Sequence, residues 1–274
     1  MNLQSPGADL FKLGPVTIRW YGIMIALGFL CSIAAATRLA KRWEIDSDKI
    51  VNLALACFLG GIIGARLYYV ALSWNYFSTH LLEILFSSTE GFSIRGLSIH
   101  GGMIGALICG YFYCRRAGLP ILRSCDLMAA CIPLGQAIGR WGNFFNSEAF
   151  GGPVPDQFPL KLFIPLAQRP AMFRDSEYFH ATFLYESVWD LLLFLILYFY
   201  AADKLKRFPG MTLFIYIAGY SVGRLLIEPL RTDSIMMPGL AIPAPSIVSA
   251  IMLAIALVAI AFLLWKSAKS AVKE

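Results

Sequence analysis

Residues Ile247–Trp265 read IVSAIMLAIALVAIAFLLW, an apolar run without a single charged side chain. Such a run is long enough to cross the hydrocarbon core of a bilayer as one helix, which takes about 20 apolar residues. Six further stretches qualify or nearly qualify as spans: Val16–Ala36, Ile50–Leu72, Leu97–Cys114, Leu127–Asn146, Ala181–Ala202 and Met211–Ile227. The sequence therefore predicts an all-α polytopic membrane protein with about seven transmembrane helices.

Composition agrees with a membrane protein. Of the 274 residues, 58% are hydrophobic and only 15% are charged, whereas soluble domains carry about 25% charged residues. In a soluble protein the net charge of +6 would suggest a nucleic-acid partner; here basic loops on one side of a membrane explain it better, and we expect no nucleic acid. The six cysteines show no metal-type CxxC spacing, so we expect no metal site and no cofactor.

The loops predict the orientation, because Lys and Arg concentrate in cytoplasmic loops. Basic residues follow the first, third, fifth and seventh spans: Arg38, Lys41, Arg42, Lys49, Arg115, Arg116, Arg123, Lys204, Lys206, Arg207, Lys266, Lys269 and Lys273. The opposite loops are poorer in basic residues for their length. This pattern predicts an N-terminus outside and a C-terminus in the cytoplasm, and we expect no cleavable signal peptide before the first span.

The longest connection, Ser147–His180, is rich in proline and falls on the predicted outer side. We expect residues 147–180 to form a small extracytoplasmic cap, with room for short strands, inserted in a single transmembrane domain covering residues 1–274. A further apolar patch, Leu81–Phe86, is too short to span and is predicted to lie in the membrane interface.

Several ionisable residues lie at or near membrane depth, where a charge costs about 2.5–3.5 kcal/mol on insertion scales. They are Arg66, Arg140, Glu186, Asp190, Arg224 and Glu228, with His100 close to a helix start. Such groups line a wet cavity or a substrate path, and the alternative is a set of structural ion pairs. We expect arginine to outnumber its partners and therefore to require an anionic ligand. Because Arg binds phosphate through bidentate hydrogen bonds, a phospholipid head group is the nearest candidate.

Two segments are especially rich in polar groups. In Gly139–Gly152, GRWGNFFNSEAFGG, helical spacing places Arg140, Asn143 and Asn146 in one sector, with Glu148 at the helix exit. In Tyr220–Asp233, YSVGRLLIEPLRTD, the residues Tyr220, Arg224 and Glu228 share one face. Pro229 should bend or end that helix and leave Arg231 near the outer surface. An Arg224–Glu228 pair that merely stabilises the helix is the structural alternative.

His100 precedes two glycines that leave space for a ligand. A lone histidine is more often structural, but His100 has the chemistry to titrate near neutral pH and to act as a general base.

The Gly139–Gly152 run resembles the signature of bacterial phosphatidylglycerol–prolipoprotein diacylglyceryl transferases. Five further motifs of that family occur in the same order: RWYG (Arg19–Gly22), GARLYYV (Gly64–Val70), IHGG (Ile99–Gly102), FLYE (Phe183–Glu186) and GYSVGRLLIEPLRTD (Gly219–Asp233). The resemblance covers nearly the whole chain. It implies transfer of the diacylglyceryl group of phosphatidylglycerol to the lipobox cysteine of a prolipoprotein. The reaction forms a thioether, releases glycerol phosphate and begins lipoprotein maturation in the bacterial cytoplasmic (inner) membrane.

The resemblance also implies site residues. Arg140 and Arg224 would stabilise the phosphate leaving group, and His100 is a candidate base for the substrate thiol, with Glu148 and Glu228 as alternatives. Substrate binding or site architecture is implied for Tyr21, Arg66, Asn143, Asn146, Glu148, Gly151, Tyr220, Glu228 and Arg231. No protein nucleophile is required, because the substrate thiol itself attacks the glyceryl carbon.

Two departures from the family pattern weaken local inferences. Many members have His-Pro-Ser-Gln before Leu-Tyr-Glu, where this chain has His180-Ala181-Thr182-Phe183, and the final helix lacks a Gln near its start at Ala244–Ser249. Two other functions fit membrane arginines: an anionic-solute transporter, which the absence of a repeated half disfavours, and a lipid-binding assembly protein without chemistry.

Overall fold

The computed structural model describes residues 1–14, 16–84, 98–237, 239 and 242–271. These residues form two compact units, one made of Met1–Ala35 with Cys125–Glu274 and the other of Ala36–Ser124. Each unit is described separately below. The prediction of a single domain over residues 1–274 stays a prediction.

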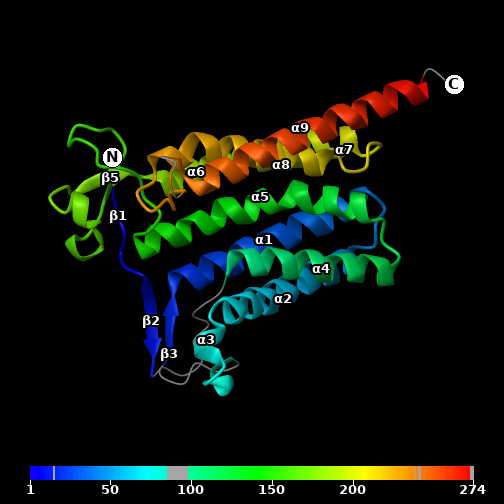
Figure 1. The fold of residues 1–274 in the computed structure, drawn as a ribbon. Coiled ribbons are helices and arrows are strands. Elements are labelled where there is room, and N and C mark those ends of the chain that lie inside the picture. The colour runs from blue at the N-terminus through cyan, green and yellow to red at the C-terminus, as the bar shows by residue number, and fades with distance from the viewer. Residues whose placement is uncertain (15, 85–97, 238, 240–241, 272–274) are drawn as a thin grey trace. The chain divides into compact units, whose positions relative to one another are not determined.

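The first unit is built mainly from long apolar helices. The long helices are the first part of α1 (Trp20–Arg42), nearly all of α5 (Ile121–Asn146), α6 (Thr182–Leu195), α8 (Met211–Ile227) and α9 (Ala244–Ala271). Shorter elements follow α6 and α8: the π-helix η4 (Ile196–Ala201) and α7 (Ala202–Leu205) after α6, and η5 (Glu228–Leu230) after α8. Helix α8 packs along α9 and also against α6 (Figure 1). Since α9 leaves Ile251, Leu257 and Phe262 exposed, one apolar face is free to meet lipid.

Short strands lie at the N-terminus and in the segment between α5 and α6. Strand β1 (Asn2–Gln4) pairs in parallel with β4 (Lys161–Phe163), which pairs antiparallel with β5 (Tyr178–His180). Leu162 and Phe179 are fully buried, and together with Phe144 and Phe183 they join this segment to the ends of α5 and α6. The segment 147–180 contains the short strands β4 and β5, and its description as a separate cap stays a prediction. Its extracytoplasmic location stays a prediction.

The start of the first predicted span was wrong. Residues Val16–Arg19 form strand β3, which pairs antiparallel with β2 (Asp9–Leu13), and helix α1 begins only at Trp20. A two-stranded hairpin ahead of the helix satisfies the backbone of this segment, and β-branched residues such as Thr17 and Ile18 favour strands. The apolar composition of residues 16–19 did not distinguish a strand from the start of a helix.

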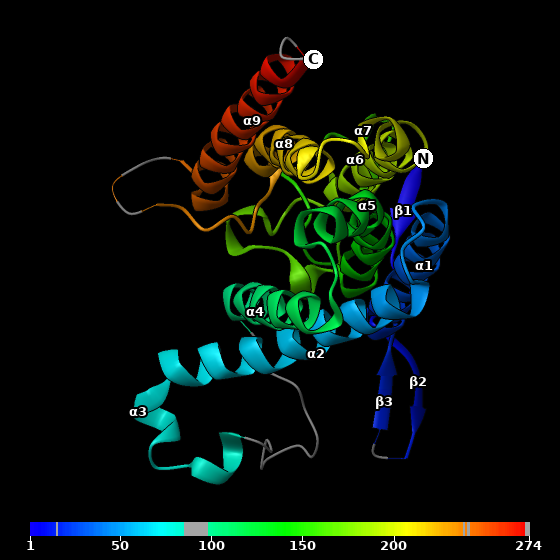
Figure 2. The ribbon, with the colours of Figure 1, turned by 90° about the vertical axis from the view of Figure 1, so that its right-hand side faces the viewer.

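The second unit contains α2 (Ser47–Leu72), α3 (Trp74–Phe77), the 3₁₀ helix η1 (Leu81–Ile84) and α4 (Ile99–Ala117). Helices α2 and α4 pack closely side by side (Figure 2). A Cβ added at Gly64 would lie 2.8 Å from the Cα of Gly105, so glycine is required for this approach, as is common between membrane helices. The predicted interfacial patch corresponds to η1 as far as Ile84, and its last two residues lie outside the described part.

Six helices are long and apolar enough to cross a membrane among the residues that the structure describes. They cover Trp20–Arg42, Ser47–Leu72, Ile121–Asn146, Thr182–Leu205, Met211–Leu230 and Ala244–Lys269. The remaining predicted span forms α4, whose ends carry His100, Arg115 and Arg116 and which does not meet this criterion. The chain is a mainly helical, multi-pass membrane protein, and the count of seven spans stays a prediction.

Candidate functional site

The first part of the site joins α5 to α6. Arg140 lies near the end of α5, and its Nη1 is 2.9 Å from Oε2 of Glu186. Its Nε is 3.6 Å from Oδ2 of Asp190. Glu186 and Asp190 are four residues apart on α6, so they share one face of that helix, and each is only 3% exposed.

The second part comes from α8 and the segment after it. Arg224 Nη1 lies 2.6 Å from Glu186 Oε1, and Arg224 Nη2 also pairs with Glu228 Oε2. Arg231 Nη1 is 3.3 Å from the same Glu186 oxygen. Asp233 then binds Arg231 in a bidentate pair, with N–O distances of 2.9 and 2.8 Å. One buried carboxylate therefore contacts three guanidinium groups.

The backbone around Gly151 positions Arg231. Helix α8 ends in η5, which contains Pro229, and the following chain forms a bridge between Gly151 and Arg231. The N–H of Gly152 donates to the carbonyl of Leu230 at 2.8 Å. A Cβ at Gly151 would lie 2.6 Å from the Cβ of His180. A larger residue at position 151 would therefore push the chain around Gly151 away from His180.

Arg231 keeps its charge in this position. Burial by itself lowers the pKa of Arg231, but the hydrogen bond to Asp233 and the charges of Glu186 and Asp233 outweigh that effect and raise the pKa above its ordinary value. The guanidinium therefore stays ionised at any physiological pH.

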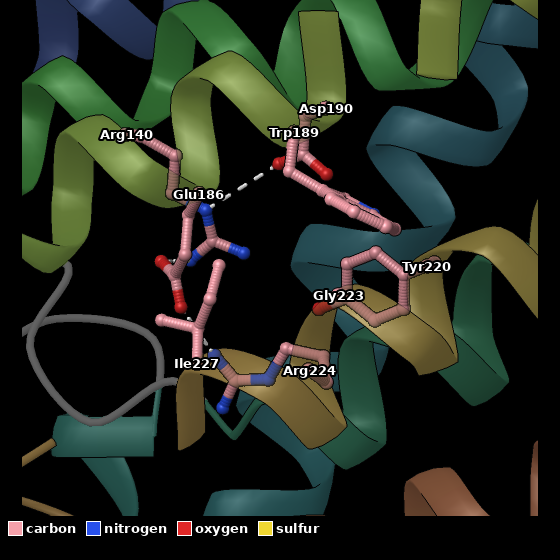
Figure 3. A pocket seen from close by; sticks show the side chains of 8 residues that line it. All are labelled: Arg140, Glu186, Trp189, Asp190, Tyr220, Gly223, Arg224 and Ile227. Atoms are coloured by element: carbon pink, nitrogen blue, oxygen red, sulfur yellow. Dashed lines mark hydrogen bonds and ion pairs between the residues drawn. The ribbon is translucent and has the colours of Figure 1, made fainter. Parts of the chain in front are cut away.

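A small hollow lies beside the charged cluster, lined by Arg140, Glu186, Trp189, Asp190, Tyr220, Gly223, Arg224 and Ile227. Figure 3 shows the third nitrogen of the Arg140 guanidinium and the hydroxyl of Tyr220 pointing into its centre. A Cβ at Gly223 would lie 2.5 Å from Cδ1 of Trp189, so glycine here allows α6 and α8 to approach. The hollow thus presents N–H and O–H donors from α5 and α8 to one point.

A second polar group occupies the end of α5. The side-chain amide of Asn143 donates to Oε1 of Glu148 at 2.9 Å. Ser147 and Ala149 have φ values of 51° and 55°, which are unusual for residues other than glycine. These two left-handed residues turn the chain on either side of Glu148, and such strained positions cluster at functional sites.

Three other predicted site residues lie close to this group or within the charged cluster. The ring of Tyr21 packs on α5, since a Cβ at Gly142 would lie 2.8 Å from Tyr21 Cδ2. Asn146 is half-buried, three residues beyond Asn143. Glu228 is 1% exposed, and it accepts a hydrogen bond of 2.9 Å from Ser234 Oγ as well as pairing with Arg224.

His100 and Arg66 belong to the second unit. His100 is exposed in the first turn of α4, with its ring centroid 6.3 Å from that of Tyr68. Arg66 donates from Nε to the carbonyl of Ile84 at 3.0 Å and from Nη2 to the carbonyl of Glu83 at 2.5 Å. It also lies over the ring of Phe77, 5.3 Å from the centroid. The substrate roles predicted for His100 and Arg66 stay predictions.

Most of the chain matches a known protein family. Residues 8–262 match the model of the family described as prolipoprotein diacylglyceryl transferase. The chain belongs to the prolipoprotein diacylglyceryl transferase family.

Two cyanobacterial relatives illustrate the match, and both are named phosphatidylglycerol–prolipoprotein diacylglyceryl transferase. The protein from Synechococcus elongatus is 46% identical over 246 residues, which cover 88% of this chain and 83% of the relative. The protein from Parasynechococcus marenigrum is 44% identical over 240 residues, which cover 86% of this chain and 84% of the relative. The family predicted from the sequence motifs is thus confirmed, and the chain is a bacterial membrane transferase of lipoprotein biosynthesis.

One expectation about this transferase was wrong. Arginine does not outnumber its partners in the described cluster, because Arg140, Arg224 and Arg231 face four carboxylates: Glu186, Asp190, Glu228 and Asp233. Burying a guanidinium without a partner is costly, so α6 supplies two acids to this region. Since a guanidinium has five N–H donors, these pairs still leave donors for a ligand.

Glu186 and Asp190 were predicted to be charges at membrane depth but were not among the predicted site residues. Their four-residue spacing within an apolar run was the available signal. Ser234 was missed entirely, since an isolated serine after a helix carries no distinctive pattern. No group of three or more His, Cys, Asp or Glu side chains suited to a metal occurs within the described ranges.

Proposed function

We propose that this protein transfers the diacylglyceryl group of phosphatidylglycerol to the thiol of the lipobox cysteine of prolipoproteins. A sulfur–carbon bond forms at the glyceryl carbon, the carbon–oxygen bond to phosphate breaks, and glycerol phosphate leaves with the electron pair. The thiol proton goes to a base. The printed names of the relatives support the two substrates. The observation that carries the proposal is the convergence of three arginines on Glu186, two of which, Arg140 and Arg224, border a small hollow.

The charged cluster suits a phosphate ester that gains negative charge as it leaves. Arg140 and Arg224 both border the hollow, and their remaining N–H groups can donate to phosphate oxygens together with the Tyr220 hydroxyl. Fixed donors stabilise developing charge most strongly where water is scarce. We therefore assign Arg140 and Arg224 to the catalytic step and Tyr220, Glu228 and Arg231 to holding or orienting the head group.

The end of α5 is proposed to contact the second substrate. Tyr21, Asn143, Asn146 and Glu148 offer hydroxyl, amide and carboxylate groups there, and Gly151 keeps the neighbouring backbone close. Contacts with backbone carbonyls favour a structural role for Arg66, which competes with its predicted role in substrate binding.

The base for the substrate thiol is assigned to His100, with Glu148 and Glu228 as alternatives. An ordinary thiol has a pKa of about 8.5 and needs a base or a nearby positive charge to react as thiolate. Glu228 is already bound to Arg224 and Ser234, which makes it the less suitable acceptor. Replacing His100 by Asn should strongly lower the transfer rate if His100 is the base.

Phosphatidylglycerol is a membrane lipid, so the reaction is placed in the bacterial cytoplasmic (inner) membrane. The distribution of Lys and Arg supports an N-terminus outside and a C-terminus in the cytoplasm. A two-tailed lipid would enter from the bilayer between helices, because passage through water would expose its acyl chains.

The test is a transfer assay with purified protein in phosphatidylglycerol nanodiscs and a lipobox peptide. We expect the peptide to gain the mass of one diacylglyceryl unit, and a Cys→Ser peptide to gain none. Absence of the shift, while the Synechococcus elongatus relative is active under the same conditions, would refute the proposal. Lipid binding without transfer would then support a lipid-binding assembly protein, and protein-dependent anion flux in liposomes would support a transporter.

A further inference from the structure

Glu186 has an unusual position within the charged cluster. Its Oε2 lies 2.9 Å from Arg140 Nη1, while its Oε1 lies 2.6 Å from Arg224 Nη1 and 3.3 Å from Arg231 Nη1. Among the residues that the structure describes, no other carboxylate is paired with more than one of these arginines. The three guanidinium groups come from α5, α8 and the chain beyond η5.

Neutralising each arginine does not by itself require Glu186. Arg140 also pairs with Asp190, Arg224 with Glu228 and Arg231 with Asp233. Burying a further carboxylate carries a desolvation penalty, and Glu186 is 3% exposed. Glu186 adds a shared contact that fixes the three guanidinium groups relative to one another, and two of them, those of Arg140 and Arg224, border the hollow.

We propose that Glu186 is the positioning residue of the transfer reaction. It holds Arg140, Arg224 and Arg231 so that their remaining N–H donors meet at one phosphate as the leaving group departs. This inference rests on the proposed function, since it assigns a role within that same site. Glu186 acts through the arginines and forms no bond to the substrate.

The charges give this proposal a distinctive consequence. The cluster combines three arginines with four carboxylates. Replacing Glu186 by Gln removes one negative charge, so an anionic lipid is attracted at least as strongly as before. The guanidinium groups lose their shared anchor, however, so stabilisation of the transition state falls. The variant should therefore keep its affinity for the anionic lipid while its turnover rate falls.

The experiment measures kcat and KM for phosphatidylglycerol with Glu186→Gln in nanodiscs and a lipobox peptide at saturation. We expect kcat to fall about 100-fold, the effect of losing one well-placed donor to a developing oxyanion, while KM is unchanged or lower. A kcat near that of the wild type would overturn the proposal. A rise in KM with kcat retained would also overturn it, because Glu186 would then serve binding alone.

Two companion variants complete the test. Glu177→Gln makes the same chemical change on an exposed residue of the insertion and should leave kcat and KM unchanged. Glu186→Asp keeps the charge on a shorter side chain and should recover part of the lost kcat. If Glu186→Gln does not fold, Glu186→Asp decides the question: wild-type kcat in that variant would overturn the proposal.

Failure of both Glu186 variants to fold, judged by thermal unfolding in detergent, would show a purely structural role and would also overturn the inference. The wild-type transfer rate tests the proposed function separately. An inactive wild-type protein refutes that function, whereas an active one with an unaffected Glu186→Gln variant refutes only the role of Glu186.

Discussion

Arginines at membrane depth occur in both units, and their surroundings differ. In the second unit, Arg66 donates to the backbone carbonyls of Glu83 and Ile84 and covers the ring of Phe77. In the first unit, Arg140 and Arg224 meet at the buried carboxylate of Glu186 and border a hollow. The first environment connects η1 to α2, whereas the second holds guanidinium groups beside a small hollow.

The comparison shows that an arginine in an apolar helix is not sufficient evidence of a site. Membrane burial only requires that the guanidinium be paired or hydrogen-bonded, and backbone carbonyls meet that requirement. A site is indicated when several arginines converge, keep unused donors and lie beside a cavity. By this criterion the cluster around Glu186 is the better candidate for phosphate binding.

The largest expected effect is the loss of an arginine from the cluster. Arg140→Ala or Arg224→Ala should reduce the transfer rate about 1000-fold, the upper range for removing one preorganised donor. Arg224→Lys should rescue little, because an ammonium cannot reproduce the planar fork of donors. The readout is the initial rate of peptide lipidation by mass spectrometry. Near-normal rates in both alanine variants would remove the distinction between the two regions.

A smaller effect is expected from Asp190→Asn. This change weakens the contact between Asp190 and Arg140 Nε, which are 3.6 Å apart, but Arg140 keeps its 2.9 Å pair with Glu186. The transfer rate should fall about tenfold, equivalent to about 1.4 kcal/mol in the barrier. Asp203→Asn, on the short helix α7, makes the same change outside the cluster. Equal rates in the two variants would argue against a role for Asp190.

Arg66→Ala tests whether the arginine of the second unit has a structural role. It removes two hydrogen bonds from a charged donor to partly buried carbonyls and should destabilise the protein by about 2–3 kcal/mol. The transfer rate per folded molecule should stay close to that of the wild type. Thermal unfolding in detergent and the lipidation assay together separate these effects. A large loss of rate without loss of stability would instead support the predicted substrate role of Arg66.

The smallest expected effect concerns pH and the insertion that carries His180. Burial lowers the pKa of His180 below its ordinary value. As the pH falls through about 6.5, the unfolded chain therefore takes up the proton first, and stability decreases. The unfolding temperature of the wild type should fall between about pH 7.5 and about pH 5.5. His180→Gln should show a smaller fall over that range, and an identical fall in both would contradict this account.

Much of the helical framework was predictable because a membrane-spanning helix requires a local run of apolar residues. Met211–Ile227, for example, forms α8 with the predicted bounds. Other helices extend beyond their runs, as α5 does when it begins at Ile121. The hairpin Asp9–Arg19 was missed, since short strands carry weak local patterns. Burial of Leu162 and Phe179 between strands depends on distant partners and is likewise not readable locally.

The sequence suggested individual candidate site residues but not how they are arranged. Sequence spacing placed Tyr220, Arg224 and Glu228 on one helix face, and the structure pairs Arg224 with Glu228. The pairing of Glu186 with arginines from α5 and α8 depends on tertiary packing, for which a single sequence gives no distance. For that reason the expected excess of arginine was wrong, and the roles predicted for the individual arginines stay predictions.

The most direct test of the central claim is an experimental structure of the protein with phosphatidylglycerol in a nanodisc. We expect the lipid phosphate to bind in the hollow of the first unit, with its oxygens within about 3 Å of nitrogens of Arg140 and Arg224. A phosphate bound elsewhere, with both arginines still engaged only by carboxylates, would contradict it.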